Sequence, residues 1–129
     1  MRSGRDILAR ALLLLNYTDL YERLDDATPP AVAARGLAAV NQIYGDLWYT
    51  GRDDPFLPLT SLDEPVLLND RQTKDVMPFG VAMLLAMSEG DSDNQQVYAT
   101  IYNRKRAAAP IARRRKDVLF AKLREEAGV

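Results

Sequence analysis

The stretch of sequence that decides the fold is an apolar run, Val76-Met77-Pro78-Phe79-Gly80-Val81-Ala82-Met83-Leu84-Leu85-Ala86-Met87. Nearly every residue from Phe79 to Met87 is apolar, which is typical of a helix that is buried on most of its sides. Pro78 must end, kink or begin the main part of this helix, since proline lacks the amide hydrogen that a helix interior needs. Asp70 is a candidate N-cap for this helix. The run is well short of the roughly 20 residues that span a bilayer. The pattern therefore predicts a helix that is buried on most of its sides, and we expect the chain to be soluble and intracellular.

A further helix is expected immediately after this run. Gly90 supplies a left-handed stop. Ser92 and Gln95 have the spacing of a capping box, in which each side chain satisfies a backbone amide of the other residue. The turn between the two helices is only a few residues long, which makes them antiparallel neighbours. The later helix stops at Pro110 and carries a narrow apolar stripe of Val97, Tyr98, Ile101 and Tyr102.

Two more helices are expected on the N-terminal side. Ser3 and Asp6 form a start like a capping box, and Asn16 fits a left-handed stop. Thr28 caps a longer helix that continues to about Tyr49. The intervening residues 17–26 are ambiguous and could add one helical turn. We predict a shared core that contains Leu37, Val40, Tyr44, Phe79, Met83, Leu84 and Ile101.

The segment 50–69 lies between the second and third helices, and its three prolines prevent a long helix. It is expected to form an extended loop or a small β-hairpin. Its apolar side chains look buried, which favours an ordered arm over disorder. A proline-rich arm that projects from a bundle also suits contacts with a neighbouring subunit. The candidate arm residues are Phe56, Leu57, Leu59, Leu62, Asp63 and Glu64. The predicted fold is an all-α bundle of about four helices with this proline-rich loop, spanning residues 1–109.

The composition excludes most catalytic chemistry. The 129 residues, 47% of them hydrophobic, fit one globular domain. Cysteine and histidine are absent from the sequence, which excludes disulfides, thiolate or imidazole metal sites and nucleophile–histidine pairs. The glycine-rich nucleotide-binding motifs are also missing. Residues 91–95 suggest a calcium loop, but Gln96 and Tyr102 stand where glycine and an acid are needed. We therefore expect a binding or assembly protein with no metal, no cofactor and no enzymatic activity.

Charge is segregated along the chain, although the formal net charge is only −1. Residues 101–129 contain nine Lys or Arg and three acids, whereas residues 1–100 contain eight and fifteen. We interpret residues 110–129 as a basic C-terminal tail. It contains the cations Arg113, Arg114, Arg115 and Lys116, followed by the apolar Val118, Leu119, Phe120 and Leu123. A run of cations needs solvent or anions around it, and phosphate is the usual partner. Because the whole chain is not basic, contact with the DNA backbone is favoured over sequence-specific regulation.

Several stretches resemble the head–tail connector, or adaptor, proteins of tailed bacteriophages and prophages. The likeness covers about residues 37–106 and lies in Phe56–Glu64, Val76–Ala86, Ser88–Asp91, Asn94–Gln96 and Tyr102–Arg106. It implies a small helical protein that forms a homo-oligomeric ring of about a dozen copies below the portal protein. Such a ring extends the DNA channel and binds the next neck or tail protein. The resemblance also implies a location in the virion neck, after assembly in the cytoplasm of the host bacterium.

The resemblance gives the basic tail a role as well. The C-terminal segments of that family commonly reach the portal, so Arg113, Arg114, Arg115, Lys116 and Phe120 become candidate contacts to the portal or to DNA phosphates. Two other classes of protein stay open on the residues alone. One is a small DNA-binding accessory or regulatory protein of a mobile element, with the last helix as its recognition helix. The other is a carboxylate-dependent enzyme, such as a nuclease.

Overall fold

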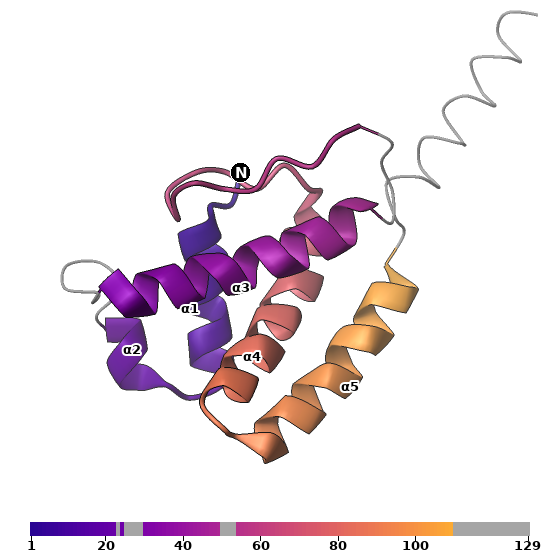
Figure 1. Ribbon diagram of the computed structural model, residues 1–129. Helices are drawn as coiled ribbons and strands as arrows, with labels where there is room; N and C mark the ends of the chain where they lie inside the picture. The colour runs from indigo at the N-terminus through magenta and orange to yellow at the C-terminus, as the bar shows by residue number, and fades with distance from the viewer. Residues whose placement is uncertain (23, 25–29, 50–53, 110–129) are drawn as a thin grey trace, which may run out of the picture.

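The computed structural model describes residues 1–22, 24, 30–49 and 54–109, and this part of the chain is all-α, as predicted (Figure 1). None of the described residues forms a β-strand, and an isolated antiparallel bridge joins Ser3 to Pro65. The elements are α1 (Gly4–Leu14), α2 (Thr18–Glu22), α3 (Pro30–Tyr49), the π-helical turn η1 (Gln72–Val76), α4 (Met77–Ser88) and α5 (Ser92–Ala108). The short helix α2 occupies the region that the sequence left ambiguous. The proposed basic tail, and with it the boundary at residue 110, lies outside the described residues.

The helix α4 is the centre of the structure, as its apolar sequence predicts. It packs against α1, α3 and α5, and no residue from Met77 to Ala86 is exposed. Figure 1 shows α4 between α1 and α5, with α3 crossing it. A helix that is covered from three directions needs apolar residues on nearly all of its circumference. This requirement explains why α4 has no polar face.

The helices α4 and α5 are antiparallel neighbours, as the short turn predicts (Figure 1). Gly90 adopts a left-handed conformation with φ of 71°. The predicted capping box of Ser92 and Gln95 is wrong by one residue. Asp91 is the cap instead, and its carboxylate accepts a hydrogen bond from the backbone N–H of Asn94 at 3.3 Å. An ionised carboxylate is a stronger acceptor than a hydroxyl and also suits the positive end of the helix.

Pro78 begins α4, one of the three outcomes that the sequence allowed. The π-helical turn η1 precedes it, and the backbone N–H of Met77 donates to the carbonyl of Gln72, five residues earlier. The predicted cap Asp70 does not fill that role. The side chain of Asn69 accepts from the backbone N–H of Gln72 at 2.8 Å, while Asp70 pairs with Arg2. A π-turn widens the helix locally, and here it joins the helical residues 70–71 to α4, which starts at Met77 with Pro78 in its first turn.

The π-turn contains a polar side chain that is buried without full compensation. Gln72 is only 1% exposed, and its Oε1 has no hydrogen-bond partner. A buried acceptor without a donor costs about 1–3 kcal/mol. We predict that Gln72→Met, which keeps an unbranched side chain of similar size, raises the free energy of unfolding by about 1–2 kcal/mol. Urea unfolding measures this change. The exposed Gln96→Met is the control and should shift stability by less than about 0.5 kcal/mol; a loss of stability in Gln72→Met would contradict the prediction.

The N-terminal helix begins and ends as predicted. The Ser3 hydroxyl accepts from the amide of Asp6, and the Asp6 carboxylate accepts from the amide of Ser3, which completes the capping box. Asn16 has a positive φ of 63°. The predicted cap Thr28 lies outside the described residues. The segment 62–66 then lies along this N-terminus, because the carbonyl of Leu62 accepts from the amide of Arg5 at 2.8 Å.

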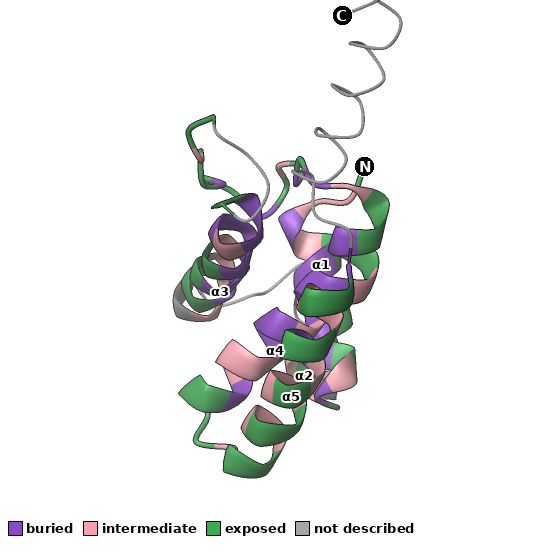
Figure 2. Ribbon diagram, turned by 90° about the vertical axis from the view of Figure 1, so that its right-hand side faces the viewer, coloured by how far each residue is buried: buried purple, intermediate pink, exposed green. Residues whose placement is uncertain are grey.

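The predicted core set is only partly buried. Val40 and Tyr44 are buried, whereas Leu37, Phe79, Met83, Leu84 and Ile101 are half-buried. The expectation that all seven are buried together is therefore wrong. The reason is that α5 lies at the edge of the molecule and buries only Tyr102 among its own residues (Figure 2). The fully buried side chains instead come from α1, α3, α4 and the segments around them, and include Ile7, Ile43, Val66, Met77 and Val81.

Candidate functional site

A groove of about 870 Å³ lies between α3 and α5. Both helices pack on α4, and the groove lies where they approach each other. Figure 1 shows that the C-terminal end of α3 lies near the C-terminal half of α5. The groove is lined by apolar, aromatic and charged side chains, which include Ile43, Asp46, Tyr49, Phe56, Tyr102 and Arg106.

A carboxylate joins the two walls of this groove. The Tyr102 hydroxyl donates to Asp46 Oδ2 at 2.6 Å, and Arg106 Nη2 lies 3.1 Å from Asp46 Oδ1. Burial and the neighbouring Asp46 carboxylate raise the pKa of the Tyr102 hydroxyl well above its usual value. The phenol therefore stays protonated and continues to donate at neutral pH. This pairing fixes α5 to α3 across the groove.

We predict that Tyr102→Phe lowers the free energy of unfolding by about 1–2 kcal/mol at pH 7, because a hydrogen bond to a charged group is lost. The same bond should make stability depend on pH. The folded-state pKa of Tyr102 lies above the unfolded value of about 10. Its contribution is therefore complete below pH 10 and is lost as the pH rises through the folded-state pKa. Urea unfolding of the wild type and the variant between pH 7 and 11 measures both effects.

Tyr98→Phe is the matched control on the same helix. The Tyr98 hydroxyl donates to the backbone carbonyl of Leu14 at 2.6 Å, so its loss removes a hydrogen bond to a neutral acceptor. Like the wild type, the Tyr98 variant should lose stability as the pH rises above about 10. In the Tyr102 variant this loss should be smaller. An unchanged pH profile in Tyr102→Phe would show that the Asp46 contacts do not hold α5 in place.

An aromatic cluster forms the end of the groove and attaches the arm to α3. The ring of Phe56 lies edge-on to Tyr44, with centroids 5.0 Å apart, and also contacts Trp48 and Tyr49. A Cβ atom at Gly45 would lie 3.1 Å from the Phe56 ring. The absence of a side chain at Gly45 therefore allows the ring to lie against α3. Edge-to-face pairs add about 0.5–1.5 kcal/mol each to simple burial.

The two inner leucines of the predicted arm also pack on the chain's own helices. Leu59 and Leu62 are both buried, as their apolar character predicts. The side-chain amide of Asn41 holds the backbone of Leu59 from both sides. It donates to the Leu59 carbonyl at 2.9 Å and accepts from the Leu59 amide at 2.7 Å. The arm is therefore clamped to α3 at Phe56 and at Leu59.

The remaining arm residues lie at the surface. Asp63 pairs with Arg5 of α1 at 2.9 Å, and Glu64 accepts hydrogen bonds from the backbone and hydroxyl of Thr60. Leu57 is 78% exposed, contrary to the buried appearance of its sequence context. Among the four apolar residues of the candidate arm, Leu57 is therefore the one whose side chain is exposed to solvent. Tyr49, at the C-terminal end of α3, is also an exposed large side chain, with 68% of its surface accessible.

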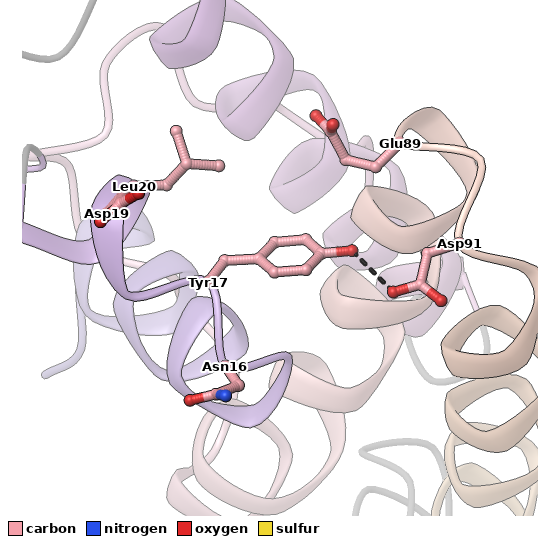
Figure 3. Close-up of a pocket in the computed structure, with 6 residues that line it drawn as sticks. All are labelled: Asn16, Tyr17, Asp19, Leu20, Glu89 and Asp91. Atoms are coloured by element: carbon pink, nitrogen blue, oxygen red, sulfur yellow. Dashed lines mark hydrogen bonds between the residues drawn. The ribbon is translucent and has the colours of Figure 1, made fainter.

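An acidic hollow lies at the opposite end of α5, next to α2 (Figure 3). Asp19, Glu89 and Asp91 line it together with Tyr17. The Tyr17 hydroxyl donates to Asp91 Oδ2 at 3.0 Å, and burial together with this carboxylate raises the pKa of Tyr17 to about 12. The hydrogen bonds from Asn94 lower the pKa of Asp91. Within the described residues, no group of three or more acidic side chains is arranged to hold a metal ion.

The described part of the chain also carries the beginning of the basic region. Arg104 is exposed, Arg106 pairs with Asp46, and Lys105 Nζ lies 4.7 Å above the ring of Phe79. The sequence patterns did not predict this cation–π contact, although Phe79 and Lys105 both lie in stretches that carry the family resemblance. The proposed contact residues Arg113, Arg114, Arg115, Lys116 and Phe120 lie outside the described residues. The charge segregation therefore has a spatial counterpart along α5, from acidic at its start to basic at its end.

Comparison of the chain with protein-family models, with curated proteins and with solved structures finds no significant match. None of the helices in the described ranges is long and apolar enough to cross a membrane.

Proposed function

We propose that this chain is a structural virion protein of the head–tail connector type, which forms a ring below the portal, extends the DNA channel and joins head to tail. The observation that carries the proposal is the presence of two unlike surfaces at the two ends of α5. One is the groove with Tyr49, Phe56 and Arg106, and the other is the acidic hollow with Asp91. A ring of identical subunits needs two different surfaces that fit each other.

The stretch that carries the family resemblance supports the same proposal. Residues 56–106 supply the clamped arm, η1 and the antiparallel pair of α4 and α5. Glu89, Asp91 and Asp93 lie at the turn before α5 or in its first turn, while Arg104, Lys105 and Arg106 lie in its last turns. The helix has 17 residues and is therefore about 25 Å long. Opposite charges separated by this length favour one register between neighbours and disfavour others.

A DNA-binding accessory protein of a mobile element is the second candidate. Gln96, Thr100 and Asn103 are exposed on α5 and lie at helical spacing along one face. Amide side chains on an exposed helix can read bases in the major groove. The acids at the start of the same helix oppose this function, because they would approach DNA phosphates.

The test is electron microscopy of the full chain incubated with the portal protein encoded beside it. The proposal expects rings of about a dozen copies stacked on the portal. Footprinting on DNA from the same genome is run in parallel, with and without magnesium. Absence of portal binding together with protection of one DNA sequence would favour the second candidate. Metal-dependent cleavage that survives repurification would favour a carboxylate-dependent enzyme.

A further inference from the structure

The outer face of α5 is exposed along its whole length. Its exposed residues recur at steps of three and four, which places them on one side of the helix (Figure 2). This stripe, which we call the α5 face, includes Asp93, Gln96, Val97, Thr100, Asn103 and Arg104. Because α5 lies at the edge of the described bundle, a partner can reach the whole stripe.

The charges of the α5 face lie at its two ends. Residues 94–103 contain no charged residue, while Asp93 precedes this stretch and Arg104 follows it. An acid at the start of a helix and a cation at its end compensate the helix dipole, which accounts for the two signs. The dipole does not account for a charge-free centre, in which Val97 is 52% exposed. Loss of charged residues from the centre of a surface is typical of protein interfaces.

This charge pattern selects a second copy of α5, in the antiparallel direction, as the partner. In a parallel pair Asp93 would lie beside Asp93 and Arg104 beside Arg104, and like charges repel each other. In an antiparallel pair each Arg104 lies beside the Asp93 of the other copy, and the two helix dipoles also attract. Within the described part of the chain neither residue forms an ion pair, so both charges are available.

A two-fold axis at Thr100 brings the other polar groups of the α5 face into register. Thr100 then lies opposite its own copy. Since an α-helix rises about 1.5 Å per residue, Gln96 lies within about 1.5 Å of the height of Asn103 of the other copy. Their side-chain amides can exchange hydrogen bonds. Asp93 lies about 4.5 Å from the height of Arg104 of the other copy, which a long side chain can span.

We propose that the α5 face pairs with the α5 face of a second copy, antiparallel and about a two-fold axis at Thr100. Such a contact is closed at two copies. It is therefore separate from the head-to-tail contact of the proposed ring and does not rest on it. One helix from each copy is a small interface compared with the roughly 800 Å² per partner of a stable complex, so the pair is weak and forms at high protein concentration.

Disulfide cross-linking of the chain alone tests the two-fold axis, because the sequence contains no cysteine. Two helices packed about 8–10 Å apart bring facing Cα atoms within about 6 Å, a distance that a disulfide can bridge. Thr100→Cys should therefore form a disulfide dimer on mild oxidation. Gln96→Cys and Asn103→Cys should each give about tenfold less dimer alone, because each then lies about 9–12 Å from its own copy. A mixture of these two variants should give a mixed dimer.

Two outcomes of this experiment would overturn the proposal. One is the absence of a dimer from Thr100→Cys. The other is an equal yield from the three single variants, which would indicate random collision instead of a two-fold contact.

Charge reversal tests the register of the pair. Combined with Thr100→Cys, either Asp93→Arg or Arg104→Asp places like charges together at both ends of the pair and should lower the dimer yield about tenfold. A mixture of the two variants, one of them carrying a size tag, has opposite charges at both ends again and should regain the yield as a mixed dimer. Circular dichroism checks that each variant stays helical. A yield that ignores both reversals would reject the antiparallel pairing.

Duplex DNA is the other partner that a polar helix face suits. The rate at which a maleimide alkylates Thr100→Cys separates the two partners. It should fall about threefold or more as the protein concentration rises from about 10 μM to about 1 mM, because the pair covers this position. Protection by DNA without any effect of protein concentration would assign the face to DNA and overturn the proposal. Portal binding is measured in separate samples, so its outcome leaves this inference unaffected.

Discussion

Replacing Tyr44 with alanine is expected to lower the free energy of unfolding by about 3–5 kcal/mol, the usual cost of truncating a buried aromatic residue. Tyr44 is 2% exposed, and its ring contacts both Trp48 and Phe56. Its hydroxyl also accepts a hydrogen bond from the backbone amide of Leu67 at 3.0 Å. The variant thus loses apolar burial, two aromatic contacts and a link between α3 and the segment before η1. A typical domain has only 5–15 kcal/mol of stability, so a large decrease in the urea midpoint is expected.

Tyr49→Ala is the matched control for this experiment. Tyr49 is the same residue type in the same helix, but it is 68% exposed. Its replacement should lower stability by no more than about 1 kcal/mol, because it loses one edge contact with Phe56 and little burial. Tyr44→Phe separates the two contributions at the buried position, since it removes the hydroxyl and keeps the ring. Similar costs for Tyr44→Ala and Tyr49→Ala would show that the aromatic cluster does not hold the arm to α3.

The sequence predicted those parts of the fold that depend on local physics. The apolar run ending at Met87 predicted a helix covered from several directions, and α4 is that helix. Ser3 with Asp6, Asn16 and Gly90 act on their own backbone within a few residues, so their positions as caps and stops could be recognised directly. The pattern predicts the cap of α5 at Ser92 instead of Asp91, because both residue types are good caps and local sequence does not choose between neighbouring positions.

The arm and the groove could not be predicted in the same way, because long-range contacts create them. The sequence favoured burial of Phe56, Leu59 and Leu62 but suggested a neighbouring subunit as the partner of the arm. The structure packs all three on the chain's own bundle, with Asn41 bonded to a backbone that is 18 positions away. The groove depends on the angle between α3 and α5 and on the pairing of Asp46 with Tyr102. Residues so far apart in the chain leave no periodic pattern that joins them.

Truncation after Ala109 is expected to abolish association with the portal while leaving the helical content and the melting cooperativity nearly unchanged. The helices α1–α5 and the buried core of the described residues lie within residues 4–109. The removed residues carry the run Arg113–Lys116 and the apolar residues around Phe120. Circular dichroism follows folding, and co-sedimentation with the portal follows binding. An unfolded truncated protein would show that the tail belongs to the core, contrary to this assignment.

Replacing Arg113, Arg114, Arg115 and Lys116 with glutamine tests the cations without removing the apolar residues. Charges that steer association act through a field that salt screens within about 8–10 Å. The variant should therefore bind the portal or DNA more slowly and with a flatter salt dependence. Lys122→Gln with Arg124→Gln is the control for a general loss of positive charge and should keep the salt dependence. If instead the truncated protein folds and joins the portal at normal affinity, docking lies elsewhere, and the exposed Leu57 of the Phe56–Glu64 arm becomes the contact to test.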